Sequence, residues 1–422
     1  MTESPIRVGR ATDPERFLAT DHTVWFAEEP AAPTEEQLIG IPEEHRFAAD
    51  IDGSDPGTYP GVYGVFAMTL SVPGPSGGTR HVPCAGLTWV GVHPDHRRKG
   101  VLTAMLRHHF EQVHEQDGTH VSALHASEPA IYGRHGYGLA SLELEVSLSR
   151  GTTLTAPDLE DAAGAVTTHL ASVSDPDVPK RMRECHLGCA GLGSVVGDAG
   201  YYVRICHQLP EELRDKESWR VLFARRGGVD VGFAMFRRTH KWERARPAGE
   251  LSVWALVGDP AAQLALLRRL LDFDLIATVK VRAAGVDDPL LQWVGGGPRA
   301  TSDLATYDSL WVRLVDLPEA LRDRTWSAPC DVVIEVADTM APWNDGRWRV
   351  RADEAGEATV EKTAAETDVR LRVDALGAAY LGGGNLAAMQ RAGLVTEQRK
   401  GAVAELWRAM RTDVAPTAAF GF

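Results

Sequence analysis

The stretch Ala85–Met105 constrains the fold of this chain more than any other part of the sequence. It begins with an apolar run, Leu87–Val92, breaks at His93-Pro94-Asp95, and passes through Arg97-Arg98-Lys99-Gly100 into a segment of helical periodicity. A buried strand, a basic turn with a glycine and the start of a helix form an anion site, because free backbone N–H groups and the positive end of the helix dipole face the same point. Two arginines and a lysine beside that point favour a ligand with more than one phosphate.

The helix after Gly100 is predicted to be amphipathic. Its apolar positions fall on one face and should be buried; they are Leu102, Met105, Leu106, Phe110 and Val113. The polar residues His108, His109, His114 and Glu115 fall mostly on exposed faces.

Length, composition and charge limit the classes of protein to consider. A chain of 422 residues predicts two or three domains, and 44% hydrophobic with 24% charged residues is globular composition. The net charge of −14 argues against nonspecific nucleic-acid binding, which needs basic patches. No apolar run approaches the roughly 20 residues of a membrane span, and the N-terminus lacks the apolar region of a signal peptide. We therefore predict a soluble, cytoplasmic protein without nucleic-acid or membrane partners.

The five cysteines are expected to be reduced thiols. Cys185-His186-Leu-Gly-Cys189 and Cys206-His207 contain residues that can bind metals, but their spacing is not that of a zinc site. Buried free thiols are the preferred interpretation, and no metal is predicted.

Before this stretch, the sequence predicts a strand at Ile6–Arg10 and a helix capped by Asp13. It also predicts a second helix start at which Thr34 and Gln37 form a capping box. Further strands are expected near residues 47–54, 63–72, 121–126 and 142–148, because apolar and β-branched residues lie there between turn signals.

The middle of the chain contains an apparent second copy of the strand, break and helix. Leu251–Pro260 is an apolar strand with a tryptophan that ends in Asp and Pro, and a helical segment, Ala261–Phe273, follows. The copy lacks the Arg-Arg-Lys-Gly turn. We interpret it as a degenerate internal duplication that kept the fold and lost the anion site, although chance similarity of two common strand–turn–helix units is the alternative.

The last part of the chain, from about Leu304, alternates apolar and polar residues in several short segments, as in an antiparallel sheet with one solvated face. Three helices are expected at 375–381, 386–392 and 401–410. The C-terminus, Ala415–Phe422, is apolar and aromatic. Because chain ends are normally polar and frayed, this tail is predicted to be buried.

Arg97-x-x-Gly100 after an apolar strand resembles the pyrophosphate loop of the GCN5-related N-acetyltransferases (GNAT), although Leu102 stands where many members have a second Gly or Ala. Three further features narrow the match: residues 96–102, the segments 123–128 and 131–138, and an aromatic last residue after Pro-Thr-Ala-Ala-Phe. Together they resemble the Eis (enhanced intracellular survival) acetyltransferases over essentially the whole chain.

This resemblance implies an α/β (α+β) architecture of tandem GNAT-fold domains followed by a sterol-carrier-protein-like α+β domain. The expected boundaries are 1–150 for the catalytic domain, 151–303 for the degenerate GNAT-like domain and 304–422 for the last domain, whose tail would reach the active site. The resemblance also implies a homo-hexamer.

The implied reaction is acetyl transfer from acetyl-CoA to an amine by direct attack. Tyr132 matches the family's proton donor; Tyr137 is the alternative by position alone, and either could instead be a packed aromatic residue. The base would be the α-carboxylate of Phe422, whose ordinary pKa of about 3.5 an apolar pocket would raise. A hydrophobic tail that serves only packing is the alternative.

The resemblance also assigns the residues that bind acetyl-CoA: Val90, Gly91, Val92, Arg97, Arg98, Lys99, Gly100, Val101, Leu102, Thr103, Ser127 and Glu128. Trp89 is expected to line the amine pocket, with a buried core tryptophan as the alternative. Trp25, Phe26, Glu28 and Glu29 are candidate aromatic and acidic walls for a polycation.

Aminoglycosides and other multi-amine compounds are the candidate small-molecule substrates. Gly421 departs from family members that have an acidic residue before the terminal Phe, which weakens the transfer of an aminoglycoside preference. The alternatives are a protein-lysine acetyltransferase and a non-catalytic protein that binds CoA or, through its last domain, a lipid.

Overall fold

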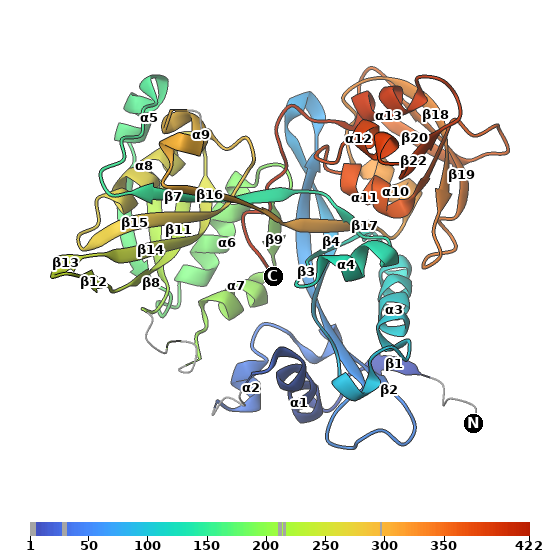
Figure 1. Cartoon of the computed structure of the whole chain (residues 1–422), viewed down its shortest axis with the longest axis horizontal. Coiled ribbons are helices and arrows are strands. Elements are labelled where there is room, and N and C mark those ends of the chain that lie inside the picture. Colours follow the sequence, from blue (N-terminus) through green and yellow to red (C-terminus); the bar gives the residue numbers. More distant parts are fainter. Residues whose placement is uncertain (1–5, 28–31, 210–212, 214–216, 296–297) are drawn as a thin grey trace. The chain divides into compact units, whose positions relative to one another are not determined.

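The computed structural model of the chain describes residues 6–27, 32–209, 213, 217–295 and 298–422. The chain divides into two compact units (Figure 1). The first unit holds Met1–Ala140, Leu310–Asp413 and Phe422, and the second holds Ser141–Ser309 and Val414–Gly421. In the described part of the chain, no helix has the length and apolar character that a membrane span requires.

The first sheet of the first unit carries the stretch that the sequence singled out. Its strands, in spatial order, are β1 (Arg7–Arg10), β2 (Arg46–Asp50), β3 (Gly61–Pro73), β4 (Thr79–Val92), β5 (Val121–His125), β17 (Leu310–Leu314) and β6 (Gly138–Leu139). The β4 and β5 strands pair in parallel, while the other neighbours pair antiparallel.

The parallel pair is connected by a crossover helix, as parallel strands require. This helix is α3 (Val101–Glu115); it buries Met105, Leu106 and Phe110 against the sheet, as predicted. The expectation of a mostly exposed face at His109 was wrong, because His109 is 1% exposed. Its ring Nε2 lies 2.8 Å from Ser122 Oγ, which provides the partner that burial of a polar group demands.

Two short helices and one longer helix complete this part of the unit. They are α1 (Pro14–Trp25), α2 (Thr34–Gln37) and α4 (Pro129–Tyr132). Asp13 caps α1 as predicted and accepts hydrogen bonds from the N–H groups of Glu15 and Arg16. The capping box at Thr34 was wrong: α2 begins at Thr34 itself, with Pro33 at the cap position and no side-chain cap bond.

The first unit also contains a third sheet with its own helices. Its strands, in spatial order, are β20 (Ala358–Lys362), β19 (Gly346–Ala352), β18 (Cys330–Ala337), β21 (Val369–Arg372) and β22 (Val395–Glu397). Its helices are α10 (Leu317–Asp323), α11 (Val373–Ala379), α12 (Leu386–Arg391) and α13 (Ala402–Met410). Along β19, buried Trp348 and Val350 alternate with Arg349 and Arg351, which confirms the predicted half-solvated strand.

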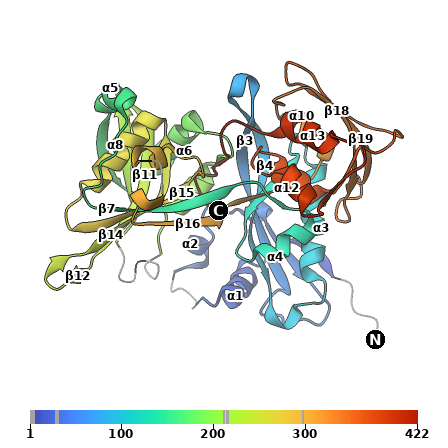
Figure 2. The same ribbon diagram turned by 45° about the horizontal axis from the view of Figure 1, so that its top comes forward.

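The second unit is built around a second sheet (Figure 2). Its strands, in spatial order, are β16 (Asp303–Asp308), β7 (Leu142–Ser149), β15 (Ile276–Ala284), β14 (Gly249–Gly258), β11 (Val229–Thr239), β10 (Arg220–Arg226) and β8 (Thr167–Ser172). Outside this sheet, the second unit has a separate hairpin of β12 (Trp242–Glu243) and β13 (Arg246–Pro247) and the short strand β9 (Val195–Gly197). Its helices are α5 (Glu160–Gly164), α6 (Val178–Cys189), α7 (Ala199–Cys206), α8 (Pro260–Leu271) and α9 (Pro289–Trp293).

The second sheet repeats the central motif of the first. The β14 and β15 strands pair in parallel and are joined by α8, just as β4 and β5 are joined by α3. Alternate residues of β10 and β11, such as Leu222 and Ala234, pack in one core cluster with α8. The duplication that the sequence suggested is therefore present in the fold.

The two sheets do not follow the order of the sequence. The β7 strand, expected at the end of the first domain, pairs with β15 and β16 in the second sheet. The β17 strand, expected in the last domain, lies between β5 and β6 in the first sheet. A local hydrophobic pattern identifies a strand but not its partner, so this exchange could not be read from the sequence.

Candidate active site

A β-bulge interrupts β4 in the middle of the predicted binding stretch. Val62 pairs with Gly91 and Gly64 pairs with Thr88, so two residues, Trp89 and Val90, oppose one residue of β3. Trp89 has a positive φ of 51°, which is uncommon for a non-glycine residue. Bulges of this kind redirect a strand and are common beside active sites.

The bulge coincides with an opening between β4 and β5. Their parallel ladder joins Cys84–Gly86 to Val121–Ala123 and extends no further among the described residues. Beyond it, β4 continues to Val92, while Leu124 and His125 of β5 pair with β17. The strands therefore diverge and leave the β5-facing edge of β4, from Leu87 onward, available to an extended ligand.

The basic loop follows directly at the end of β4. Arg98 and Gly100 have φ values of 62° and 85°, so the loop turns twice through left-handed conformations before α3 begins. The side chains of Arg97, Arg98 and Lys99 are exposed, and α3 has no side-chain cap and no acidic residue in its first turn. The helix N-terminus is thus open to an anion, and three cations stand beside it.

The corresponding loop of the second sheet is closed by the chain itself. Asp259 caps α8 by accepting a hydrogen bond from Ala262 N at 2.9 Å, and Arg226 donates to both of its carboxylate oxygens at 2.8 and 3.2 Å. The Arg226 guanidinium is the main reason that the pKa of Asp259 is lowered. A carboxylate of the protein occupies the place where the first copy would accept a ligand's anion.

The two candidate tyrosines lie in different environments. Tyr132 ends α4 and is partly buried; burial, with a smaller contribution from Glu128, raises its pKa to about 12. Tyr137 is fully buried, and its ring meets that of Tyr132 edge-on at 5.9 Å. Burial raises the pKa of Tyr137 as well.

The hydroxyl of Tyr137 belongs to a buried network. Ser122 Oγ donates to Ala85 O at 3.0 Å and lies 2.8 Å from both Tyr137 Oη and His109 Nε2. Because Ser122 has one proton and gives it to the carbonyl, Tyr137 and His109 must both donate to Ser122. Burial lowers the pKa of His109 to about 3, so its ring is neutral near pH 7 and donates from Nε2. The Tyr137 proton is already used inside the core.

Phe422, the last residue, packs in the first unit near the divergence of β4 and β5. Its ring meets that of His125 edge-on at 5.1 Å. A Cβ atom added to Gly86 would lie 3.0 Å from Phe422 Cε2. The sequence did not single out His125 or Gly86, because a strand-end histidine and a strand glycine carry no local signal of a contact with the other end of the chain.

The remaining predicted site residues differ in how far they are exposed. Trp89 is partly buried and its ring lies 5.6 Å from that of Phe17 in α1. Trp25 and Phe26, at the end of α1, are 47% and 88% exposed. Ser127 and Glu128 are exposed in the turn between β5 and α4. Glu28 and Glu29 lie outside the described residues.

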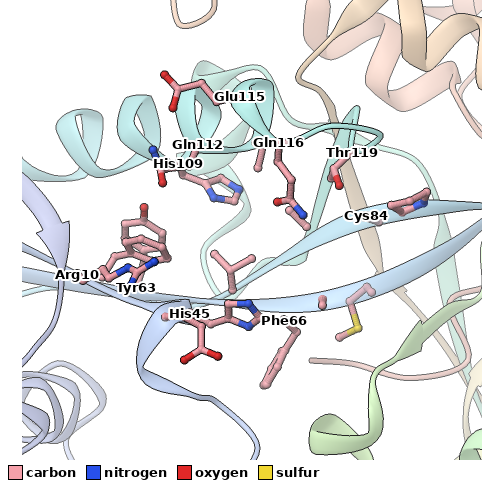
Figure 3. Close-up of a pocket in the computed structure, with 18 residues that line it drawn as sticks. Arg10, His45, Tyr63, Phe66, Cys84, His109, Gln112, Glu115, Gln116 and Thr119 are labelled. Atoms are coloured by element: carbon pink, nitrogen blue, oxygen red, sulfur yellow. The ribbon is translucent and has the colours of Figure 1, made fainter.

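A separate pocket of about 490 Å³ lies between α3 and strands β3 and β4 (Figure 3). Tyr63 rises from the sheet toward the helix, and His109 and Gln116 lie beneath α3, whereas Glu115 points away (Figure 3). None of the predicted site residues lines this pocket. The Tyr63 hydroxyl lies 2.7 Å from His108 Nδ1, so it is engaged within the fold.

The cysteines of the structure carry free thiols, and four of the five are buried; Cys189 is partly exposed. Within the described residues, no group of three or more His, Cys, Asp or Glu side chains has an arrangement that could hold a metal ion.

Three parts of the chain match known protein families. Residues 5–140 and 193–314 each match an acetyltransferase (GNAT) domain, and residues 317–419 match a sterol carrier protein domain. This succession confirms the predicted architecture of two GNAT-fold domains and a sterol-carrier-protein-like domain.

Relatives and solved structures of the same length agree with this result. An uncharacterized N-acetyltransferase of Streptomyces coelicolor is 40% identical over 372 residues, which cover 86% of each chain. N-acetyltransferase Eis of Mycobacterium tuberculosis is 27% identical over 381 residues, 88% of each chain. The crystal structure of Eis1 from Mycobacterium abscessus is 28% identical and covers 99% of this chain and 100% of its own, with a TM-score of 0.80.

Proposed function

Because this chain belongs to the Eis-like GCN5-related N-acetyltransferases, enzymes whose donor is an acyl-CoA, we propose that it transfers an acetyl group from acetyl-CoA to an amine of a small molecule. The observation that carries the proposal is the contrast between the two loops. The loop at Arg97–Gly100 presents three exposed cations and an uncapped helix, whereas Asp259 fills the corresponding place in the second sheet.

The residues at the end of β4 fit the donor. Arg97, Arg98 and Lys99, with the N–H groups of Gly100, Val101, Leu102 and Thr103, would bind the pyrophosphate. The backbone of Val90, Gly91 and Val92 would pair with the pantetheine as an added strand would, because β4 diverges from β5 there. Ser127 and Glu128, at the start of α4, would add polar contacts. When bound, acetyl-CoA supplies the thioester.

Tyr132 is proposed as the general acid. Its raised pKa keeps the phenol protonated over the physiological range, so that it donates to the sulfur as negative charge develops there. Tyr137 is less suited, because its proton is directed to Ser122 in a fully buried network.

The α-carboxylate of Phe422 is proposed as the base that accepts the proton of the attacking amine. The position of its ring against Gly86 and His125 brings the end of the chain to the divergence of β4 and β5. Trp89 would line the amine pocket, and Trp25 and Phe26 offer exposed aromatic faces to a cationic substrate.

Thiol release from acetyl-CoA, measured against aminoglycosides, polyamines and lysine peptides, tests the reaction and distinguishes small-molecule from protein substrates. Absence of release with every amine would refute the enzymatic proposal.

A second experiment appends a few residues after Phe422. We expect turnover to fall by at least about 100-fold while acetyl-CoA still binds; full turnover in a folded protein would exclude the terminal carboxylate as base. The proposed homo-hexamer is tested by light scattering, which should give six times the mass of one chain.

A further inference from the structure

The C-terminal tail, Val414–Gly421, is enclosed by the rest of the second unit, Ser141–Ser309, which we call the second domain from here on. The lost anion site does not explain this. Phe420 is 1% exposed and is surrounded by five aromatic rings. The ring centroids lie 5.0 to 6.5 Å from that of Phe420 and belong to His186, Trp254, Phe233, Tyr202 and Tyr201. We call these five residues the aromatic cage.

The cage stands where the second domain would have its own substrate site. In β14, Met235 pairs with Ala255 and Phe236 with Val253, so Trp254 is the extra residue of a register shift. Trp89 occupies the bulge of β4 in the first domain. The two tryptophans are therefore counterparts, and in the second domain Phe420 fills the space beside the tryptophan.

The backbone of the tail is also fixed at several points. Ala415 N donates to Asp287 Oδ2 at 2.7 Å, and Thr417 N donates to Leu192 O at 2.8 Å. Tyr201 Oη donates to Gly421 O at 3.0 Å. Gly421 immediately precedes Phe422, so this last bond holds the peptide group that carries the terminal residue.

Tyr202 provides a comparison within the same helix. It is as deeply buried as Tyr201, but its hydroxyl lies 2.7 Å from His186 Nδ1 instead of a tail carbonyl. The ring of Tyr202 contributes to the cage, while its hydroxyl belongs to the core of the second domain. Of these two hydroxyls, that of Tyr201 donates to the backbone next to Phe422.

We propose that the second domain has become a holder for the C-terminus, in which Phe420 is the anchor and Tyr201 the positioning residue that orients the carboxylate of Phe422. This inference rests on the proposed role of that carboxylate as the base. Fixing Gly421 reduces the conformational freedom of the last residue further, in addition to the packing of the Phe422 ring. Because a displacement of about 1 Å at a reacting group can cost about 100-fold in rate, such fixation would raise kcat without contributing to donor binding.

The first measurement does not depend on activity. A carboxypeptidase that prefers aromatic residues is applied to the full-length protein, and the release of Phe422 is followed by mass spectrometry. We expect at least tenfold faster release in Phe420→Ala and several-fold faster release in Tyr201→Phe. The matched control, Tyr202→Phe, should stay within twofold of the unmodified chain, because it loses a buried hydroxyl but no tail bond.

The second measurement compares kcat and KM. Tyr201→Phe should lower kcat about tenfold and Phe420→Ala about 100-fold, with KM for acetyl-CoA unchanged within twofold. Tyr202→Phe should keep its kcat. In a chain that ends at Gly421, Phe420→Ala should cause no further loss, because there is no carboxylate of Phe422 left to position.

The outcomes separate the two proposals. Equal release of Phe422 from Tyr201→Phe and Tyr202→Phe, or an unchanged kcat in Tyr201→Phe, would overturn the positioning role. An unchanged kcat in the chain that ends at Gly421 would show that the Phe422 carboxylate is not required as base, and the carboxypeptidase comparison would still decide whether the cage holds the tail.

Discussion

At the scale of single residues, Tyr132 and Tyr137 show how burial separates two side chains of the same chemistry. Tyr132→Phe should lower the single-turnover rate by about 100- to 1,000-fold, because the leaving sulfur loses its donor. Tyr137→Phe should keep the rate within about threefold and lower the free energy of unfolding by about 1 kcal/mol, because only a buried hydrogen bond is lost. A larger rate loss in Tyr137→Phe than in Tyr132→Phe would reverse the assignment.

The same tyrosine predicts a pH profile. The pKa of Tyr132 is raised to about 12, so the phenol remains a donor well above its ordinary pKa of about 10. The single-turnover rate should therefore not fall between pH 8 and about pH 10.5 through loss of this proton. A fall with a midpoint near pH 10 that disappears in Tyr132→Phe would contradict a desolvated donor.

Gly86 offers a test from the opposite side of the tail. A Cβ atom at this position would lie 2.8 Å from Met68 Cγ and 3.0 Å from Phe422 Cε2, so Gly86→Ala must displace one or both side chains. We expect a fall in kcat of about tenfold with little change in acetyl-CoA binding, measured by steady-state kinetics and calorimetry. Met68→Ala in the same chain relieves the first contact and serves as the control; full recovery of kcat would show that Phe422 was not displaced.

Single-residue features were predictable where the signal is local. The Asp13 cap and the loop at Arg97–Gly100 follow from residue type and spacing alone, and the structure contains both. Thr34 had the right neighbours for a capping box, but Pro33 already took the cap position. His109 was predicted on an exposed face of α3, but its ring is buried. The hydrogen bond with Ser122, which lies outside α3 in the sequence, offsets the cost of burying this polar ring.

At the scale of helices and strands, Arg324 connects two helix ends. It is 1% exposed and donates to the carbonyl oxygens of Ala379, Tyr380 and Met410, at the C-terminal ends of α11 and α13. Arg324→Met would leave these buried acceptors unpaired, so we expect a loss of about 3 kcal/mol in denaturant unfolding. Arg324→Lys should recover little, because an ammonium cannot reproduce the planar fork. Unchanged stability in both variants would contradict this role.

A second link, between His120 and α10, depends on pH. His120 Nδ1 lies 2.7 Å from Asp323 Oδ2, and this hydrogen bond is the main reason that the pKa of His120 is raised. A raised pKa in the folded state means that the stabilisation is complete below the unfolded pKa of about 6.5 and is lost as the pH rises through the folded value.

His120→Gln should therefore lower the melting temperature more at pH 5.5 than at pH 8.5. Asp323→Asn, which removes the other partner, should show the same dependence. Equal losses of melting temperature at the two pH values would show that the stabilisation by this pair does not depend on the charge of His120.

Strands were predictable from alternation, but their partners were not. Strands were predicted at residues 142–148 and in the alternating segments from about Leu304, and β7 and β17 form there. The pattern contains nothing that sends β7 to the second sheet and β17 back to the first. In the same way, the apolar tail predicted burial, and its partners in the second domain became visible only in the fold.

At the scale of the whole molecule, the exchanged strand decides which parts of the chain can fold alone. Leu310, Val312 and Leu314 of β17 are fully buried, and β17 lies between β5 and β6. A fragment of residues 1–150 lacks this strand and should not unfold cooperatively.

Ala140 N donates to Leu310 O at 2.9 Å, and β6 and β17 are antiparallel. A two-residue Asn-Gly turn can therefore join residue 140 to residue 310 as a tight hairpin.

The joined chain, residues 1–140 and 310–413, keeps the first and third sheets and the basic loop but loses the second domain and the tail. We expect cooperative thermal unfolding and acetyl-CoA binding within about threefold of the full chain, because the donor contacts we propose all come from the first unit. Turnover should fall to the level of the full chain that ends at Gly421, because both lack the carboxylate of Phe422. Turnover equal to that of the full chain would show that neither the second domain nor the tail takes part in the reaction.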